Sequence, residues 1–104
     1  MTVLVDNNGW QATGRITETM PNLDLSEMFR SFGWHASEID GHNLEALDDA
    51  LVSAKSDGRP SAIVCKTRKG KGVSFMEDDN NWHYRAPNQT ELESAMRELQ
   101  IRYA

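Results

Sequence analysis

The run Ala62-Ile63-Val64-Cys65 constrains the fold of this 104-residue chain more than any other segment. It is apolar without alternation, it follows the breaker Asp57–Pro60, and it ends at the charged residue Lys66. An unbroken apolar run of this length is typical of a parallel strand that is buried on both faces. Parallel neighbours are joined by long crossovers, usually helices. The run therefore predicts a chain that alternates strands and helices.

Two further segments have the character of strands. Val3–Val5 is a short apolar run that stops at the turn residues Asp6–Gly9, and Trp34–Ile39 alternates loosely between apolar and polar residues. A strand this close to residue 1 has no earlier element to pack against it. We therefore expect a further segment or another chain to cover it.

The segments between and after these strands have helical spacing. Leu25–Phe32 carries apolar residues three and four apart, with Asp24 or Asn22 as a cap and Gly33 as a left-handed end. Leu44–Ser56 also carries apolar residues three and four apart, and Asn43 is its expected cap. A last helix is predicted from a capping box of Thr90 and Glu93, whereas residues 10–22 and 77–89 are predicted loops.

Alternation of strands and helices predicts the α/β class, with a parallel sheet and helices on both of its faces. Ligands bind such sheets beyond the carboxyl ends of the strands. Three loops are expected there: residues 6–14, residues 40–43, and residues 67–83. We treat residues 1–104 as part of one domain, because this length does not support more.

The composition excludes some classes of function. An apolar fraction of 38% and a charged fraction of 26% are those of a globular protein, and no apolar run reaches the roughly 18 residues of a membrane span. A net charge of −5 argues against nucleic acid as a ligand. Without a secretory signal, we expect a cytoplasmic protein. The lone Cys65 is expected to be a small buried hydrophobe.

Two polar loops suggest ion binding. The first, Asp6–Trp10, offers carboxylate, amide and carbonyl oxygens, which suit magnesium, although a polar turn after a strand has the same composition. The second, Thr67–Gly72, combines lysines with glycines, so its amides and cations suit an anion; a solvated basic turn is the alternative.

The histidines differ in their surroundings. His83 lies in an aromatic loop that contains proline, where an imidazole suits proton transfer or hydrogen bonding to a phosphate; satisfaction by local backbone is the alternative. His42 follows Asp-Gly, so we expect it to fix a turn, and His35 is expected to be structural or exposed. No pair of histidines or cysteines has the spacing of a zinc site.

Taken in order, these segments resemble the transketolase family, whose enzymes depend on thiamine diphosphate. The resemblance rests on three stretches, which cover nearly the whole chain: VDNNGWQATG at residues 5–14, FGWHASEIDGH at residues 32–42, and KTRKGKGVSFM at residues 66–76 with WH at residues 82–83 and AP at residues 86–87. The first resembles the end of the thiamine-diphosphate motif. The motifs are most similar to those of two-subunit transketolases, in which the cofactor half and the pyrimidine half are separate chains.

The resemblance implies roles for three residues. Asn8 would bind magnesium through its side chain, and Trp10 would bind the same ion through its carbonyl oxygen. Trp10 is bulkier than the usual aliphatic residue, which a carbonyl role tolerates. His83 would lie near the diphosphate and the reacting centre of the substrate. The chain would then be the C-terminal part of the N-terminal diphosphate-binding domain, with thiamine diphosphate and Mg²⁺ as cofactors.

The resemblance also implies an activity: transfer of a two-carbon ketol unit between sugar phosphates. The Gly-Asp-Gly segment and the pyrimidine domain of the family are not in this sequence. We therefore expect a subunit or split fragment that is inactive alone and forms a hetero-oligomer with complementary chains. Two alternatives stay open: a non-catalytic remnant or interaction module, and a related thiamine enzyme with another donor, such as a sulfo-sugar.

Overall fold

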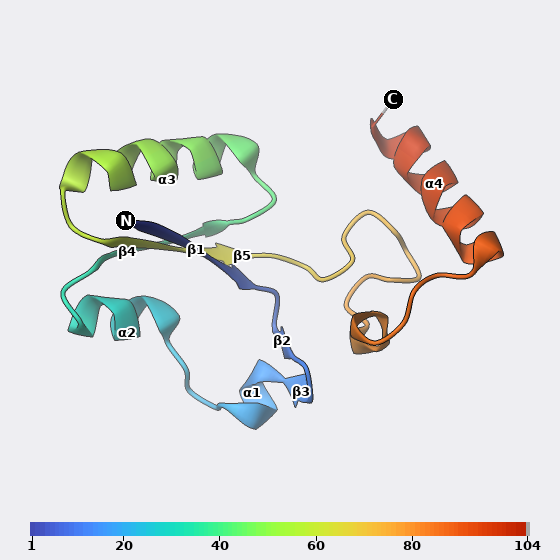
Figure 1. The fold of residues 1–104 in the computed structure, drawn as a ribbon, viewed down its shortest axis with the longest axis horizontal. Coiled ribbons are helices and arrows are strands. Elements are labelled where there is room, and N and C mark those ends of the chain that lie inside the picture. Colours follow the sequence, from blue (N-terminus) through green and yellow to red (C-terminus); the bar gives the residue numbers. More distant parts are fainter. Residues whose placement is uncertain (104) are drawn as a thin grey trace.

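The central element of the fold is a parallel sheet of three strands (Figure 1). The structure, a computed structural model, describes residues 1–103, with side chains as far as residue 100. The strands run in the order β1 (Thr2–Asn7), β5 (Ser61–Lys66) and β4 (His35–Asp40). The middle strand holds Ala62, Ile63 and Val64, each with 0% of its surface exposed. The predicted strand with two buried faces is therefore confirmed.

Helices cover both faces of this sheet, as predicted. Helix α3 (Leu44–Asp57) lies on one face and helix α2 (Leu25–Ser31) lies on the other (Figure 1). The core is built between α3 and the sheet, where three buried side chains are surrounded by partly buried apolar ones: Ala54, Ile63 and Cys65 with Ile39, Leu47 and Ala50. Cys65 is thus the buried hydrophobe that the sequence predicts.

The predicted ends of these helices are also confirmed. The side chain of Asp24, and not that of Asn22, caps α2 by accepting a hydrogen bond of 2.9 Å from the amide of Glu27. Asn43 caps α3. Gly33 follows α2 with a φ of 81°, a left-handed conformation in which glycine lacks the steric penalty of other residues.

The segment predicted as a loop over residues 10–22 contains regular structure. Strands β2 (Trp10–Gln11) and β3 (Gly14–Arg15) form a short antiparallel pair, and α1 (Ile16–Thr19) follows. The prediction missed these elements because strands of two residues and a helix of four residues are too short to show a period.

The C-terminal part extends away from the sheet (Figure 1). It comprises a 3₁₀ helix, η1 (Asn80–His83), and helix α4 (Gln89–Tyr103). The predicted capping box of Thr90 and Glu93 is wrong. Asn88 accepts from the amide of Glu91 at 2.9 Å, and Glu91 accepts from the amide of Asn88 at 2.8 Å. An asparagine therefore starts the helix earlier than the expected threonine.

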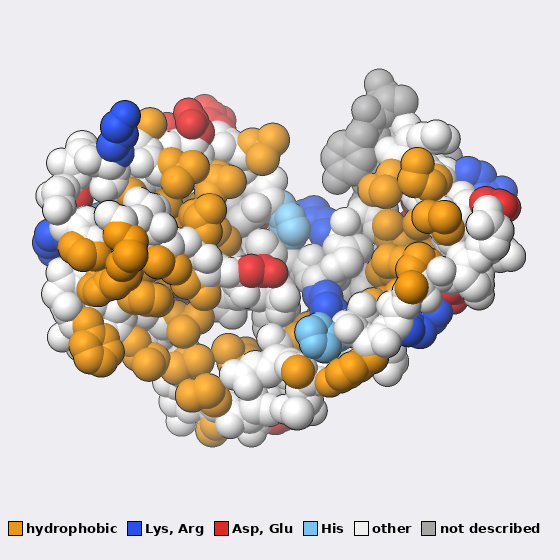
Figure 2. Space-filling view, viewed as in Figure 1, with side chains coloured by type: hydrophobic (Ala, Val, Ile, Leu, Met, Phe, Trp, Pro, Cys, Tyr) orange, Lys and Arg blue, Asp and Glu red, His pale blue; other side chains and the backbone are white. Residues whose placement is uncertain are grey.

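The apolar surface is unevenly distributed. Figure 2 shows hydrophobic side chains gathered over β1 and α2, with a second group over α4. Leu4 on β1 and Phe32 after α2 are 52% and 79% exposed, and Leu92 and Met96 on α4 are about half exposed. None of the helices within residues 1–103 is long and apolar enough to cross a membrane.

Candidate functional site

The carboxyl edge of the sheet gathers the three predicted loops. The amide of Thr67, after β5, donates to the carbonyl of Asn7 at the end of β1, over 3.3 Å. The amide of Gly41, after β4, donates to the carbonyl of Lys66 over 2.8 Å. The ring of His42 accepts a 2.8 Å hydrogen bond from the amide of Arg68. His42 therefore joins two loops, in addition to its position in the turn after β4.

Asn8 and Trp10 form one turn at this edge. The side-chain oxygen of Asn8 accepts from the amide of Trp10 at 3.0 Å, and the side-chain nitrogen donates to Asp6 at 3.2 Å. Gly9 between them has a φ of 80°. An amide oxygen has two lone pairs, so the accepted bond orients Asn8 without exhausting that oxygen. Both side chains are half-buried.

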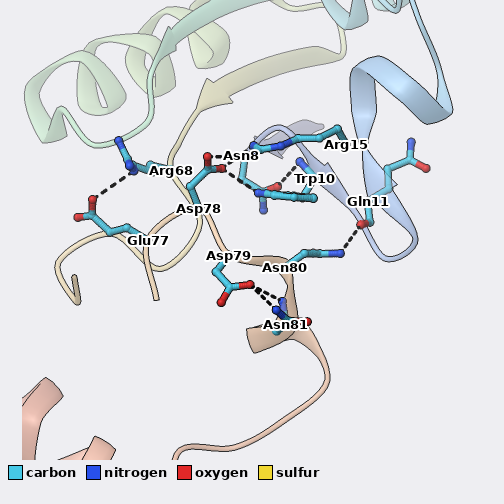
Figure 3. Close-up of polar contacts among 10 residues, drawn as sticks. All are labelled: Asn8, Trp10, Gln11, Arg15, Arg68, Glu77, Asp78, Asp79, Asn80 and Asn81. Atoms are coloured by element: carbon cyan, nitrogen blue, oxygen red, sulfur yellow. Dashed lines mark hydrogen bonds and ion pairs between the residues drawn. The ribbon is translucent and has the colours of Figure 1, made fainter. Parts of the chain in front are cut away.

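A carboxylate from the other loop fixes the side chain of Trp10. The indole Nε1 donates to Asp78 Oδ1 at 2.8 Å (Figure 3). Arg15 donates to both oxygens of the same carboxylate at 2.6 Å, and its guanidinium lies 3.7 Å from the centre of the Trp10 ring. Hydrogen bonds from Arg15 and then from Trp10 lower the pKa of Asp78 to about 2. We call this group, Trp10, Arg15 and Asp78, the carboxylate clamp.

A second set of bonds joins the same two loops. The side-chain nitrogen of Asn80 donates to the carbonyl of Gln11 at 3.2 Å (Figure 3). It also donates to the carbonyl of Ala12 at 3.1 Å. The hydroxyl of Tyr84 also donates to the carbonyl of Ala12. The loop after β1 and the loop after β5 therefore behave as one unit, although more than sixty residues separate them in the sequence.

His83 lies on a different segment from the turn of Asn8 and Trp10. It ends η1, its side chain is exposed, and its ring meets that of Tyr84 edge-on with the centres 5.0 Å apart. No hydrogen bond or ion pair within residues 1–103 joins His83 to Asn8 or Trp10. The structure thus brings two of the three predicted site residues together and leaves the third on a neighbouring segment.

The basic segment Thr67–Gly72 is partly neutralised from within. Glu77 accepts from the amide of Gly72 at 3.0 Å and pairs with Arg68 at 3.1 Å. Lys66, just before the segment, pairs with Glu38 at 2.6 Å, and Lys71 is exposed. These contacts favour the basic turn over the anion site, because a carboxylate already occupies one of the amides that an anion would use.

Sequence reasoning missed Arg15, Asp78 and Asn80. Their pairing has no local signal, because Arg15 and Asp78 are 63 residues apart and neither lies in a periodic segment. Within the part of the chain that the structure describes, no three His, Cys, Asp or Glu side chains gather as a metal site. The oxygen donors at this edge are the side-chain oxygen of Asn8, backbone carbonyls, and the carboxylate of Asp6, which accepts hydrogen bonds from Asn8 and Thr67.

The fold and these loops define an α/β domain that assembles a polar site at the carboxyl edge of its parallel sheet. Residues 1–102 match the family described as transketolase, thiamine diphosphate binding domain. The chain belongs to this family.

Relatives agree with this assignment. The chain is 30% identical to one subunit of the apulose-4-phosphate transketolase of Actinobacillus succinogenes, over 93% of this chain and 35% of that protein. It is 44% identical to a 6-deoxy-6-sulfo-D-fructose transketolase subunit of Clostridium, over 69% of this chain and 26% of that protein. The crystal structure of transketolase from Campylobacter jejuni has the same fold, with a TM-score of 0.85 and 24% identity over 96% of this chain and 16% of that one. The chain thus spans about a third or less of the length of these proteins.

Proposed function

We propose that residues 1–104 are the C-terminal part of a thiamine-diphosphate-binding domain, in a subunit or split fragment of a transketolase-type enzyme. The complete enzyme would transfer a two-carbon ketol unit between sugar phosphates, and this chain would be inactive alone. The observation that carries the proposal is the turn of Asn8 and Trp10, which fixes an amide oxygen at the carboxyl edge of the sheet. Membership of the family makes thiamine diphosphate the expected ligand of that edge.

The residues present fit a magnesium ion as partial ligands. Mg²⁺ prefers hard oxygen donors, keeps several waters, and uses few protein ligands alongside the phosphates of its substrate. The side-chain oxygen of Asn8 and the carbonyl of Trp10 are donors of this kind. The bond from the Trp10 amide holds the Asn8 oxygen in one orientation. In this proposal Asn8 and Trp10 hold the ion, and complementary chains supply the remaining protein ligand.

Each residue then has a limited task. Bound thiamine diphosphate supplies the carbon nucleophile and the electron sink of ketol transfer. Asn8 and Trp10 would hold the magnesium ion. His83, exposed on η1, would orient or protonate oxygens of the sugar phosphate, because a ring nitrogen of histidine can donate a hydrogen bond or a proton.

Partner chains are part of the proposal. Relatives of this chain are named as subunits of transketolases, which supports a hetero-oligomer with chains that carry the Gly-Asp-Gly segment and the pyrimidine domain. A cytoplasmic location stays a prediction from the sequence.

The first test is native mass spectrometry of the tagged chain purified from its source, with assays for thiamine diphosphate and magnesium. A larger assembly that holds both supports the proposal. A lone chain without cofactor supports the alternative, a non-catalytic remnant with the same fold.

Two variants then test the residue roles in that assembly. Asn8→Ala should weaken magnesium-dependent retention of the cofactor, whereas Asn7→Ala, which removes the neighbouring amide, should not. Equal retention in both variants would remove the ligand role of Asn8. His83→Ala should slow turnover more than it weakens cofactor binding, and unchanged turnover would assign His83 to structure.

A further inference from the structure

We propose that Asp78 is a positioning residue, which holds the turn of Asn8 and Trp10 in its ion-binding conformation by fixing the Trp10 indole. This role rests on the proposed function, because it takes the turn to be a magnesium site. The clamp itself is a feature of the described residues and does not depend on any bound group.

The first support is the number of donors on one carboxylate. Asp78 accepts from the indole of Trp10 at 2.8 Å and from both terminal nitrogens of Arg15 at 2.6 Å (Figure 3). Hydrogen bonds to an ionised carboxylate are about twice as strong as neutral ones, and the forked guanidinium adds geometric specificity. Arg15 also covers the face of Trp10 at 3.7 Å. The indole is therefore held at its edge and on its face.

The second support is the backbone conformation of Asp78. Its φ is 59°, a left-handed conformation that aspartate adopts more readily than most residues. Its amide donates to the carbonyl of Lys69 at 2.8 Å, which closes the loop over residues 69–78. The loop thus presents this carboxylate to Trp10 from a fixed backbone position.

The third support is that Trp10 is bound at two ends. Its backbone amide donates to the side-chain oxygen of Asn8 at 3.0 Å, while its indole donates to Asp78. Fixing the indole restricts rotation of the side chain and of the peptide that carries it. The orientation of the Asn8 oxygen therefore depends on Asp78 through Trp10, which also gives a reason for a tryptophan at a position where a carbonyl alone would serve.

The clamp is tested first in the 104-residue chain. The indole N–H resonance of Trp10, assigned by its loss in Trp10→Phe, reports directly on the bond to Asp78. In Asp78→Asn, which keeps a residue suited to a left-handed φ, this resonance should shift and exchange faster with solvent. The matched control is Asp57→Asn, because Asp57 forms a similar pair with Arg59 far from the turn and also has a pKa of about 2. An unchanged Trp10 resonance in Asp78→Asn would overturn the clamp.

The positioning role is tested in the assembled enzyme with Mg²⁺ and thiamine diphosphate. Loss of a residue that orients a metal ligand typically weakens metal affinity by about ten- to a hundredfold. We expect that loss of affinity for Mg²⁺ in Asp78→Asn, whereas Asp57→Asn should bind Mg²⁺ like the wild type. If Asp78 acts through Trp10, adding Trp10→Phe to Asp78→Asn should cause little further loss of affinity.

The outcomes separate the two proposals. Wild-type affinity for Mg²⁺ in Asp78→Asn, or additive losses in the double variant, overturns the positioning role while the proposed function stands. A wild-type assembly that binds neither Mg²⁺ nor thiamine diphosphate overturns the proposed function, and with it the assignment of the turn. In that case the Trp10 indole resonance still reports whether Asp78 binds the indole, but it carries no information about an ion site.

Discussion

Replacing Gly70 by alanine should destabilise the loop that carries Asp78 more than the backbone conformation alone explains. Gly70 has a φ of 68°, and a Cβ built on it would lie 2.6 Å from the carbonyl carbon of Met76 and closer still to its oxygen. These are backbone atoms, which cannot move aside as the end of a flexible side chain can. Gly58 has a φ of 79° and no atom within 4 Å of such a Cβ. It is therefore a control with the same strain and no clash.

The expected magnitudes follow from two free-energy costs: that of the left-handed backbone conformation and that of the steric clash. A left-handed conformation costs a residue with a side chain roughly 1–2 kcal/mol, and this cost applies to both variants. Overpacking adds about 1–3 kcal/mol, and it applies only to Gly70→Ala. The free energy of unfolding of Gly70→Ala should therefore lie below that of Gly58→Ala by about 1–3 kcal/mol. In a domain of this size each 1 kcal/mol corresponds to a Tm change of roughly 4–8 °C.

Urea unfolding of both variants measures this difference, and amide exchange locates it. The amide of Asp78, which donates to the carbonyl of Lys69, should lose protection in Gly70→Ala and keep it in Gly58→Ala. Equal stabilities and equal protection of the Asp78 amide would refute the steric reasoning, because the shared conformational cost would then account for both changes.

Three other predictions concern single side chains. Ile63→Ala should cost about 2–5 kcal/mol in urea unfolding, because Ile63 is 0% exposed at the centre of the sheet; a cost below 1 kcal/mol would contradict that packing. Asn88→Ala should lower the helicity measured by circular dichroism and the free energy of unfolding by about 1 kcal/mol, whereas Thr90→Ala should change both little. A larger loss in Thr90→Ala than in Asn88→Ala would show that Thr90 is the cap. The pKa of Asp78 falls from 3.8 to about 2, so its contribution to stability is present above pH 4 and is lost as the pH falls toward 2. Acid unfolding of Asp78→Asn should show a shallower pH dependence than the wild type, and equal slopes would contradict this.

The sequence predicts the elements whose stability comes from burial or from a local cap. The unbroken apolar run at Ala62–Cys65 predicts the middle strand, and its burial confirms that prediction. Asp24 and Asn43 are found where a helix needs a hydrogen-bond acceptor within its first turn. Patterns of this kind act over a few residues, so a single sequence contains all the information they need.

The candidate site is only partly predictable in this way. The turn of Asn8 and Trp10 follows from its place after a strand, but the clamp joins residues 63 positions apart through a carboxylate with a left-handed backbone. Such a pairing is decided by how the loops pack and not by any local pattern. The start of α4 is also not decided by local pattern, since Thr90 and Asn88 are both suitable caps and it is Asn88 that accepts from the amide of Glu91.

The position of β1 at the edge of the sheet has a practical consequence. In the sheet that the structure describes, β1 is paired only with β5, and Leu4 on it is 52% exposed. An open edge with apolar side chains is a template on which strands of other molecules add, which leads to precipitation at high concentration. Recombinant production should therefore start from co-expression with candidate partner chains, at low temperature and low inducer. Fusion to a highly soluble carrier is the natural fallback for obtaining this chain by itself.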